Sequence, residues 1–154
     1  MIFVILGTQD KPFTRLLKML EEADIDEKII VQAGYTSFSS KKMEIRDYIP
    51  KPEFSKLIEE ADLVIAHGGV GTIMECLKKG KKLLVVPRLS KYGEHQNDHQ
   101  LEITETFAEK GYLIPVYEGD DIKEKIKEAE NFTFAHYEST SHSFAEKLST
   151  YLGL

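Results

Sequence analysis

The feature that most constrains this chain is a regular alternation between short apolar runs and segments whose apolar residues recur at helical spacing. Residues 2–6 are all apolar and lead into Gly7-Thr8, which is typical of a central strand buried on both faces. Strands that alternate with helical segments predict a parallel sheet with crossover helices. The predicted strands are residues 2–6, 28–32, 44–49, 63–66, 83–86 and 112–116.

Helical spacing is found between most of the predicted strands and at the end of the chain. The predicted helices are residues 13–20, 53–60, 72–79, a long helix reaching 108, 122–129 and 144–152. We therefore expect residues 1–154 to form a single α/β domain, a Rossmann-like doubly wound parallel sheet of about six strands.

Composition narrows the class of protein. The net charge is −6 and both signs are interspersed along the chain, which disfavours nucleic-acid binding. Cys76 is the only cysteine, so no intrachain disulfide is expected and a reducing compartment fits. No stretch approaches the ~18 apolar residues of a membrane span, and the apolar start lacks a basic leader. We expect a cytoplasmic protein that works at a membrane only through another chain.

A glycine-rich turn follows the fourth predicted strand, His67-Gly68-Gly69-Val70-Gly71-Thr72, and opens a helix. Residues without Cβ atoms let backbone N–H groups approach an anion, and a helix start adds unpaired donors and a positive dipole. The turn therefore predicts a phosphate or diphosphate site. The alternative is that the glycines only make a tight turn and let the helix and the strand pack together. Neither the P-loop nor the dinucleotide-binding pattern is present.

Glu75 lies three residues after Thr72, on the same face of the helix. A carboxylate there can accept hydrogen bonds from a ribose diol beside a bound diphosphate. Thr-x-x-Glu is also the capping-box pattern, in which the carboxylate binds the first N–H of the helix. Spacing alone leaves both roles open.

A polar cluster follows the fifth predicted strand, over residues 92–100, on the same rim of the sheet as the glycine turn. Convergent donors and acceptors are what sugar recognition requires. His95 and His99 are four residues apart, which raises the alternative of a metal site, but Gln96 stands where the zincin pattern needs Glu. The polar side chains could also serve only as caps for a solvated helix start.

The chain resembles the C-terminal domain of glycosyltransferase family 28 in three segments taken together. These are His67 to Glu75, Pro87-Arg88 and residues 92–100. The resemblance covers essentially the whole chain. It is strongest to the stand-alone type, in which this domain is the catalytic subunit of a dolichol-linked UDP-N-acetylglucosamine transferase or of bacterial capsular and exopolysaccharide transferases. The fold it implies is the C-terminal half of a GT-B fold.

The resemblance implies a role for individual residues. The implied site binds the donor diphosphate, the ribose, the sugar and uracil. The diphosphate residues are Gly7, Thr8, His67, Gly68, Gly69, Gly71 and Thr72. Glu75 would bind the ribose, whereas Glu94, His99 and Gln100 would contact the sugar, with His99 replacing the acidic residue of larger relatives. Tyr48 and Ile49 fall where relatives recognise uracil.

The family also implies that the chain is half of an enzyme. Relatives close this domain against an acceptor-binding domain, for which no residues are left here, so we expect a membrane-anchored partner subunit that presents a lipid-linked acceptor at the inner membrane face. Transfer from the UDP-sugar would invert the anomeric centre without a metal or other cofactor. The catalytic base is not assigned, and His95 and Glu94 are candidates. The last predicted helix packs either on its own sheet or on the partner.

Two other functions remain open. One is a non-catalytic nucleotide-binding scaffold subunit, which would share the phosphate site. The other is a metal-dependent hydrolase built on His95 and His99.

Overall fold

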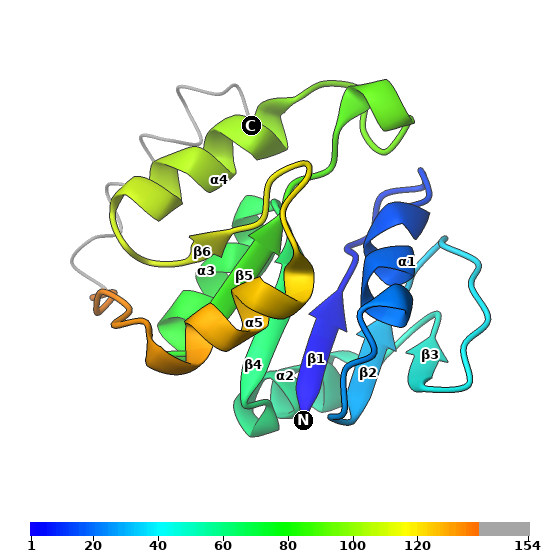
Figure 1. Cartoon of the computed structure of the whole chain (residues 1–154), viewed down its shortest axis with the longest axis horizontal. Helices are drawn as coiled ribbons and strands as arrows, with labels where there is room; N and C mark the ends of the chain where they lie inside the picture. Colours follow the sequence, from blue (N-terminus) through cyan, green and yellow to red (C-terminus); the bar gives the residue numbers. More distant parts are fainter. Residues whose placement is uncertain (139–154) are drawn as a thin grey trace.

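A computed structural model describes residues 1–138, and its core is a sheet of six parallel strands. The strands lie in the order β3-β2-β1-β4-β5-β6 (Figure 1). This is the order of a doubly wound sheet, so the predicted fold class is confirmed. The strands are β1 (Ile2–Ile5), β2 (Ile29–Gln32), β3 (Met43–Arg46), β4 (Leu63–His67), β5 (Leu83–Val86) and β6 (Ile114–Pro115).

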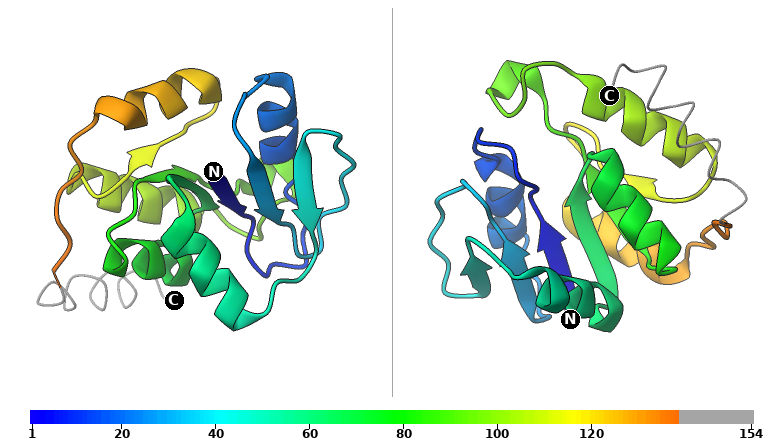
Figure 2. Two further views of the ribbon diagram at one scale, coloured as in Figure 1. Left: turned by 90° about the horizontal axis from the view of Figure 1, so that it is seen from below. Right: turned by 180° about the vertical axis from the view of Figure 1, so that it is seen from behind.

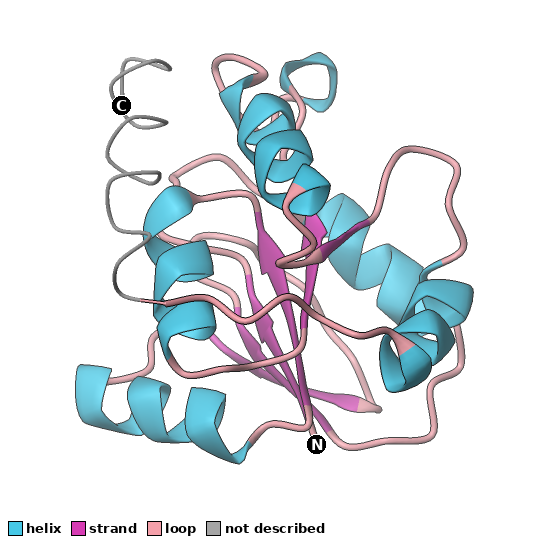
Figure 3. Ribbon diagram, turned by 90° about the vertical axis from the view of Figure 1, so that its left-hand side faces the viewer, coloured by secondary structure: helices cyan, strands magenta, loops and turns pink. Residues whose placement is uncertain are grey.

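Helices cover both faces of the sheet (Figures 2 and 3). The apolar residues of α1 and α5 pack on one face, and those of α2, α3 and α4 pack on the other. The helices are α1 (Thr14–Glu22), α2 (Lys51–Glu60), α3 (Val70–Lys78), α4 (His99–Glu109) and α5 (Ile122–Asn131), with a short 3-10 helix η1 (Ser90–Tyr92). The predicted helix over residues 144–152 lies outside the described residues. Within residues 1–138 no helix has the length and apolar character needed to cross a bilayer.

The continuous apolar run of β1 follows from this two-sided burial. Ile2 and Val4 point into the core beneath α1 and α5, whereas Phe3 and Ile5 point into the core beneath α2, α3 and α4. All four side chains are buried. A strand in this position has no solvent face, so no polar alternation is visible in its sequence.

Most element boundaries differ from the prediction by a few residues, including three that lie near the site or at the edge of the sheet. β3 ends at Arg46, which leaves Tyr48 and Ile49 in the loop that leads to α2. α3 begins at Val70 rather than Thr72, because the backbone bond from the Ile73 N–H to the Gly69 carbonyl (3.0 Å) brings Val70 and Gly71 into the first turn. β6 has only two residues and is an edge strand, where a proline such as Pro115 is tolerated.

The carboxyl ends of β1 and β4 form the topological switch point of the sheet. β1 lies between β2 and β4, so the chain leaves β1 towards one side of the sheet and β4 towards the other. The loops that follow the two strands therefore diverge and leave a crevice, which is where open α/β sheets bind ligands. The predicted glycine turn and Gly7-Thr8 both lie there.

A fully buried arginine ties the loops at this end of the sheet together. The guanidinium of Arg88 donates to the carbonyl oxygens of Leu6 (2.6 Å), Lys11 (2.7 Å) and Glu94 (2.9 Å). It also lies over the ring of Phe13, 4.9 Å from the centroid. Burial lowers the pKa of Arg88 to about 10, which leaves the side chain charged at neutral pH.

Replacing Arg88 with methionine is expected to lower the free energy of unfolding by at least about 3 kcal/mol, because three buried carbonyl groups lose their donor. Urea unfolding followed by circular dichroism measures the loss. Lys91→Met is the matched control, since Lys91 is exposed and pairs with Glu118 at the surface. That variant should change stability by less than about 1 kcal/mol. Equal effects of the two substitutions would contradict the structural role of Arg88.

Candidate functional site

A pocket of about 450 Å³ opens at the switch point. Most of the predicted diphosphate residues line it, together with the predicted uracil residues and four side chains that the prediction did not include. The lining residues are Ile5, Gly7, Thr8, Gln32, Tyr48, Ile49, Lys51, Phe54, His67, Gly69, Gly71 and Thr72. None of these is acidic, although the chain has 26 Asp and Glu residues, so the pocket is suited to an anion.

Gln32 holds the loop after β1. Its side-chain oxygen accepts from the Gly7 N–H (3.0 Å), and its side-chain nitrogen donates to the Gly7 carbonyl (3.1 Å). Both backbone groups of Gly7 are therefore used within the protein, so the N–H is not a free diphosphate donor. The sequence carries one signal for Gln32, a polar residue that ends an otherwise apolar strand.

The ring of His67 lies between two glycines. A Cβ atom built on Gly7 would come within 2.5 Å of His67 Nε2, and one built on Gly69 would come within 2.4 Å of His67 Cε1. Gly7 also has a φ of +90°, which an L side chain rarely adopts. Both glycines are thus needed to admit the histidine, whether or not a ligand is bound.

Gly68 and Gly71 differ in what surrounds them. A Cβ on Gly68 would meet Thr104 Oγ1 at 2.8 Å and the Gln100 carbonyl oxygen at 2.9 Å, so Gly68 lets α4 pack against the end of β4. Its N–H donates to the Gln100 side-chain oxygen (2.9 Å) and is not free for a ligand. A Cβ on Gly71 would have no atom within 4 Å, and this residue lines the pocket.

The start of α3 presents unpaired backbone donors. Gly69 is the N-cap and no side chain caps the helix. By helix geometry, the N–H groups of Val70, Gly71 and Thr72 have no acceptor inside the helix. Together with the dipole of α3, these groups form the part of the predicted diphosphate site that remains available for an anion.

Glu75 does not form the capping box that its spacing allowed. The N-cap is Gly69, so Glu75 lies nearly two turns into α3. Its carboxylate instead accepts from Lys51 Nζ (3.1 Å) and Ser55 Oγ (3.3 Å) of α2. The sequence analysis predicted neither partner. The one signal in the sequence is Lys51, a basic residue at the start of the helix that follows the predicted uracil residues.

Tyr48 and Ile49 lie in the loop that leads to α2, on the pocket wall. The Tyr48 side chain is 77% exposed, whereas Ile49 is buried. An exposed aromatic ring beside a pocket that Phe54 also lines can stack on a planar base. Their predicted role in uracil binding stays a prediction.

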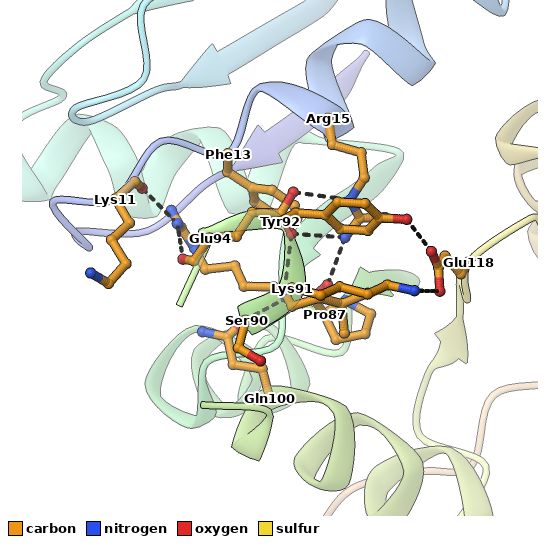
Figure 4. Close-up of polar contacts among 12 residues, drawn as sticks. Lys11, Phe13, Arg15, Pro87, Ser90, Lys91, Tyr92, Glu94, Gln100 and Glu118 are labelled. Carbon is orange, nitrogen blue, oxygen red and sulfur yellow. Dashed lines mark hydrogen bonds and ion pairs between the residues drawn. The ribbon is translucent and has the colours of Figure 1, made fainter. Parts of the chain in front are cut away.

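The burial of Glu94 argues against both roles predicted for it. Its carboxylate binds Arg15 through two hydrogen bonds of 2.9 and 3.0 Å and accepts from the Leu89 N–H (3.0 Å) (Figure 4). The side chain is 3% exposed. Arg15 also donates to the Pro87 carbonyl (3.0 Å). Glu94 thus joins the loop after β5 to α1, and its roles at the sugar and as a base stay predictions.

Gln100 also lies inside the protein rather than on the pocket wall. Its side-chain oxygen accepts from the N–H groups of Gly68 (2.9 Å) and Arg88 (3.1 Å), and its nitrogen contacts His67 Nδ1 (3.1 Å). These bonds connect the end of β4 to the end of β5, and they argue against direct contact with a donor sugar.

The two histidines of the metal-site alternative do not gather other ligands. His95 Nε2 contacts the side-chain nitrogen of Gln9 (3.4 Å), and burial lowers the pKa of His95. The N–H of His99 donates to the Asn97 side chain (3.0 Å) at the start of α4. Among residues 1–138 no three His, Cys, Asp or Glu side chains are arranged to hold a metal ion.

Comparison with known proteins places the chain in a family. The model of the glycosyltransferase family 28 C-terminal domain matches residues 1–151. Human UDP-N-acetylglucosamine transferase subunit ALG13 is 32% identical over 126 residues, which cover 73% of this chain and 11% of the human protein. The Candida albicans protein of the same name is 33% identical over 81 residues, which cover 53% of this chain and 26% of that protein. The chain thus spans a small part of the length of these relatives.

Solved structures have the same fold. An NMR structure of ALG13 superposes with a TM-score of 0.65 at 20% sequence identity, covering 99% of this chain and 96% of that chain. The glycosyltransferase SnogD from Streptomyces nogalater superposes with a TM-score of 0.60 at 18% identity, covering 99% of this chain and 39% of that chain.

Alanine at Gly68 and at Gly71 should have opposite effects on stability. Gly68→Ala is expected to lower the free energy of unfolding by about 1–3 kcal/mol, because the added methyl overlaps α4. Gly71→Ala is expected to raise it by about 0.5–1 kcal/mol, because alanine is the better helix former and has open space. Thermal and urea unfolding measure both changes. A destabilising Gly71→Ala would show that the protein itself requires the glycine.

His67 should make the protein sensitive to acid. Burial, followed by the charge of Arg88, lowers the pKa of His67 to about 3, against 6.5 for the free side chain. The unfolded chain therefore binds a proton that the folded protein excludes between those values, so stability falls as the pH falls below 6.5. From pH 7 to pH 5 the contribution of His67 is a loss of about 2 kcal/mol.

Urea unfolding at the two pH values measures this loss. His67→Asn should reduce the pH dependence, and His136→Gln is the control, because His136 is exposed. An unchanged pH dependence in His67→Asn would contradict the assignment.

Proposed function

The chain belongs to glycosyltransferase family 28, and from this membership we propose that it is the donor-binding, catalytic subunit of a two-component UDP-glycosyltransferase. The pocket at the switch point holds the nucleotide of a UDP-sugar, with the diphosphate at the start of α3. An acceptor-binding subunit anchored in the membrane completes the enzyme and presents a lipid-linked acceptor at the cytoplasmic face. Relatives named as subunits of a UDP-N-acetylglucosamine transferase support the two-component arrangement.

Gly71 is the observation that carries the proposal. Glycine costs about 1 kcal/mol relative to alanine inside a helix. Gly68 lies outside the helix, and α4 explains its missing side chain, because a Cβ atom there would collide with α4. At Gly71 the backbone is helical, no atom lies within 4 Å of the missing Cβ, and the residue faces the pocket. A ligand that approaches the backbone of the first turn explains why this position has no side chain.

The charges around the pocket fit a nucleoside diphosphate. Lys51 is the only charged residue of the lining, and its ammonium group also binds Glu75. The start of α3 and Lys51 can offset the charge that develops on the leaving diphosphate, so the proposed reaction needs no metal ion. We expect Glu75, held by Lys51 and Ser55 of α2, to accept from the ribose hydroxyls. Tyr48 and Ile49 then lie beside the base.

The catalytic base is proposed to come from the partner subunit. Glu94, one of the two candidates on this chain, is buried in an ion pair with Arg15, which disfavours it as the base. His95, the other candidate, is partly buried near Gln9. A base supplied by the second subunit fits an inverting transfer in which the acceptor hydroxyl is activated only after the two chains meet.

Calorimetry with UDP tests the donor site. The described pocket is expected to bind UDP in the micromolar range. Gly71→Ala should weaken binding at least about tenfold, because its methyl group occupies the space of the ligand, although the same variant is expected to be more stable. Lys78→Ala is the matched control, since Lys78 is exposed at the far end of α3 and should leave the affinity unchanged.

Reconstitution with the acceptor-binding subunit tests catalysis. Sugar transfer from a UDP-sugar is expected only when both chains are present, and Gly71→Ala should lower it in parallel with UDP affinity. Binding of UDP without any transfer by the reconstituted pair would favour the non-catalytic scaffold. A protein that does not bind UDP at all would contradict the proposal.

A further inference from the structure

Three side chains form a line from the interior to the pocket. The side-chain nitrogen of Gln100 contacts His67 Nδ1 (3.1 Å), and His67 Nε2 contacts the hydroxyl of Thr72 (3.3 Å). Gln100 is buried at the start of α4, His67 ends β4, and Thr72 lies in the first turn of α3 on the pocket wall. The direction of the two hydrogen bonds decides whether the Thr72 hydroxyl donates to a ligand or accepts from it.

The amide of Gln100 fixes the first direction. Its oxygen accepts from two backbone N–H groups, those of Gly68 (2.9 Å) and Arg88 (3.1 Å). A rotated amide would place its NH₂ group against two donors, so the NH₂ group must face His67. Because an amide nitrogen can only donate, His67 Nδ1 must accept and carries no proton.

The proton of the His67 ring must therefore lie on the other nitrogen. Burial and the nearby charge of Arg88 lower its pKa to about 3, so the ring is neutral at physiological pH. A neutral imidazole whose Nδ1 accepts must carry its proton on Nε2. Gly7 and Gly69 enclose the ring at distances that leave no room for a Cβ atom, which limits its movement. The Nε2–H group therefore donates to Thr72 Oγ1.

Thr72 differs from other threonines in the helices. The hydroxyls of Thr104 and Thr106 donate to the carbonyl oxygens four residues earlier, those of Gln100 (2.7 Å) and Glu102 (2.8 Å). This is the usual bond of a threonine inside a helix. The hydroxyl of Thr72 accepts from His67 instead, and within residues 1–138 no protein acceptor takes its hydrogen.

We propose that Gln100 holds His67 in the Nε2–H tautomer, and that this ring turns the hydroxyl hydrogen of Thr72 towards the pocket, where it donates to a phosphate oxygen of the bound nucleotide. The identity of the ligand rests on the proposed function, whereas the arrangement of protons belongs to the ligand-free protein. Gln100 and His67 are positioning residues in this proposal, and Thr72 makes the contact. The family resemblance assigns Gln100 to the sugar, so this is a different role for that residue.

Nitrogen NMR of the ligand-free protein labelled at histidine tests the arrangement directly. At pH 7 His67 is expected to show an unprotonated Nδ1 and a protonated Nε2, with its signals identified by their loss in His67→Asn. In Gln100→Glu a carboxylate of the same shape replaces the donor, so Nδ1 should become protonated. A role of Gln100 in packing alone would leave the ring proton where it is. Finding the proton on Nδ1 in the unmodified protein, or no change in Gln100→Glu, would overturn the proposal.

UDP titration then tests the contact. Thr72→Val removes the hydroxyl with little change of shape and is expected to weaken UDP binding about tenfold, the effect of one hydrogen bond to a charged group. Thr72→Ser keeps the hydroxyl and should restore the affinity to within about twofold. Equal affinities of the Val and Ser variants would overturn the contact. If the unmodified protein did not bind UDP, the proposed function would fail, while the NMR result would still decide the tautomer.

Discussion

The buried guanidinium of Arg88 is the interaction on which the ligand-binding end of the sheet depends. It connects the end of β1, the loop that follows and the loop after β5 through three carbonyl groups. Its own backbone N–H is held by Gln100, which also holds the end of β4. One cation and one amide thus fix the relative positions of β1, β4 and β5 at the pocket.

The fold was predictable because its signals are local. An uninterrupted apolar run such as residues 2–6 reports two-sided burial, and the glycines of the turn after β4 report a backbone that must approach something closely. The sequence alone could not show which of these glycines makes room for another part of the protein and which faces the pocket. Gly69 admits the ring of His67, Gly68 admits α4, and only Gly71 faces open space. The difference depends on neighbours that are distant in the sequence.

Polar residues were harder to interpret, for a related reason. A carboxylate or amide in a loop after a strand has the same appearance whether it contacts a ligand or satisfies buried backbone groups. Glu94 and Gln100, which the resemblance assigns to the sugar, bind Arg15, Gly68 and Arg88 inside the protein. Gln32 and Lys51 were not expected at the site and line the pocket. Whether each of these side chains lies inside the protein or on the pocket wall depends on contacts between elements, which no local sequence pattern reports.

The enclosure of His67 also links three positions in evolution. Gly69 has an ordinary φ of −79°, and the atoms that an added Cβ would approach most closely there all belong to the imidazole ring. Loss of that ring would free position 69 to vary, whereas position 7 would stay restricted by its φ of +90°. Substitutions at the two glycines are therefore conditional on the histidine to different degrees. Descendants of this sequence that abandon the ring would be expected to lose the glycine at 69 well before the one at 7.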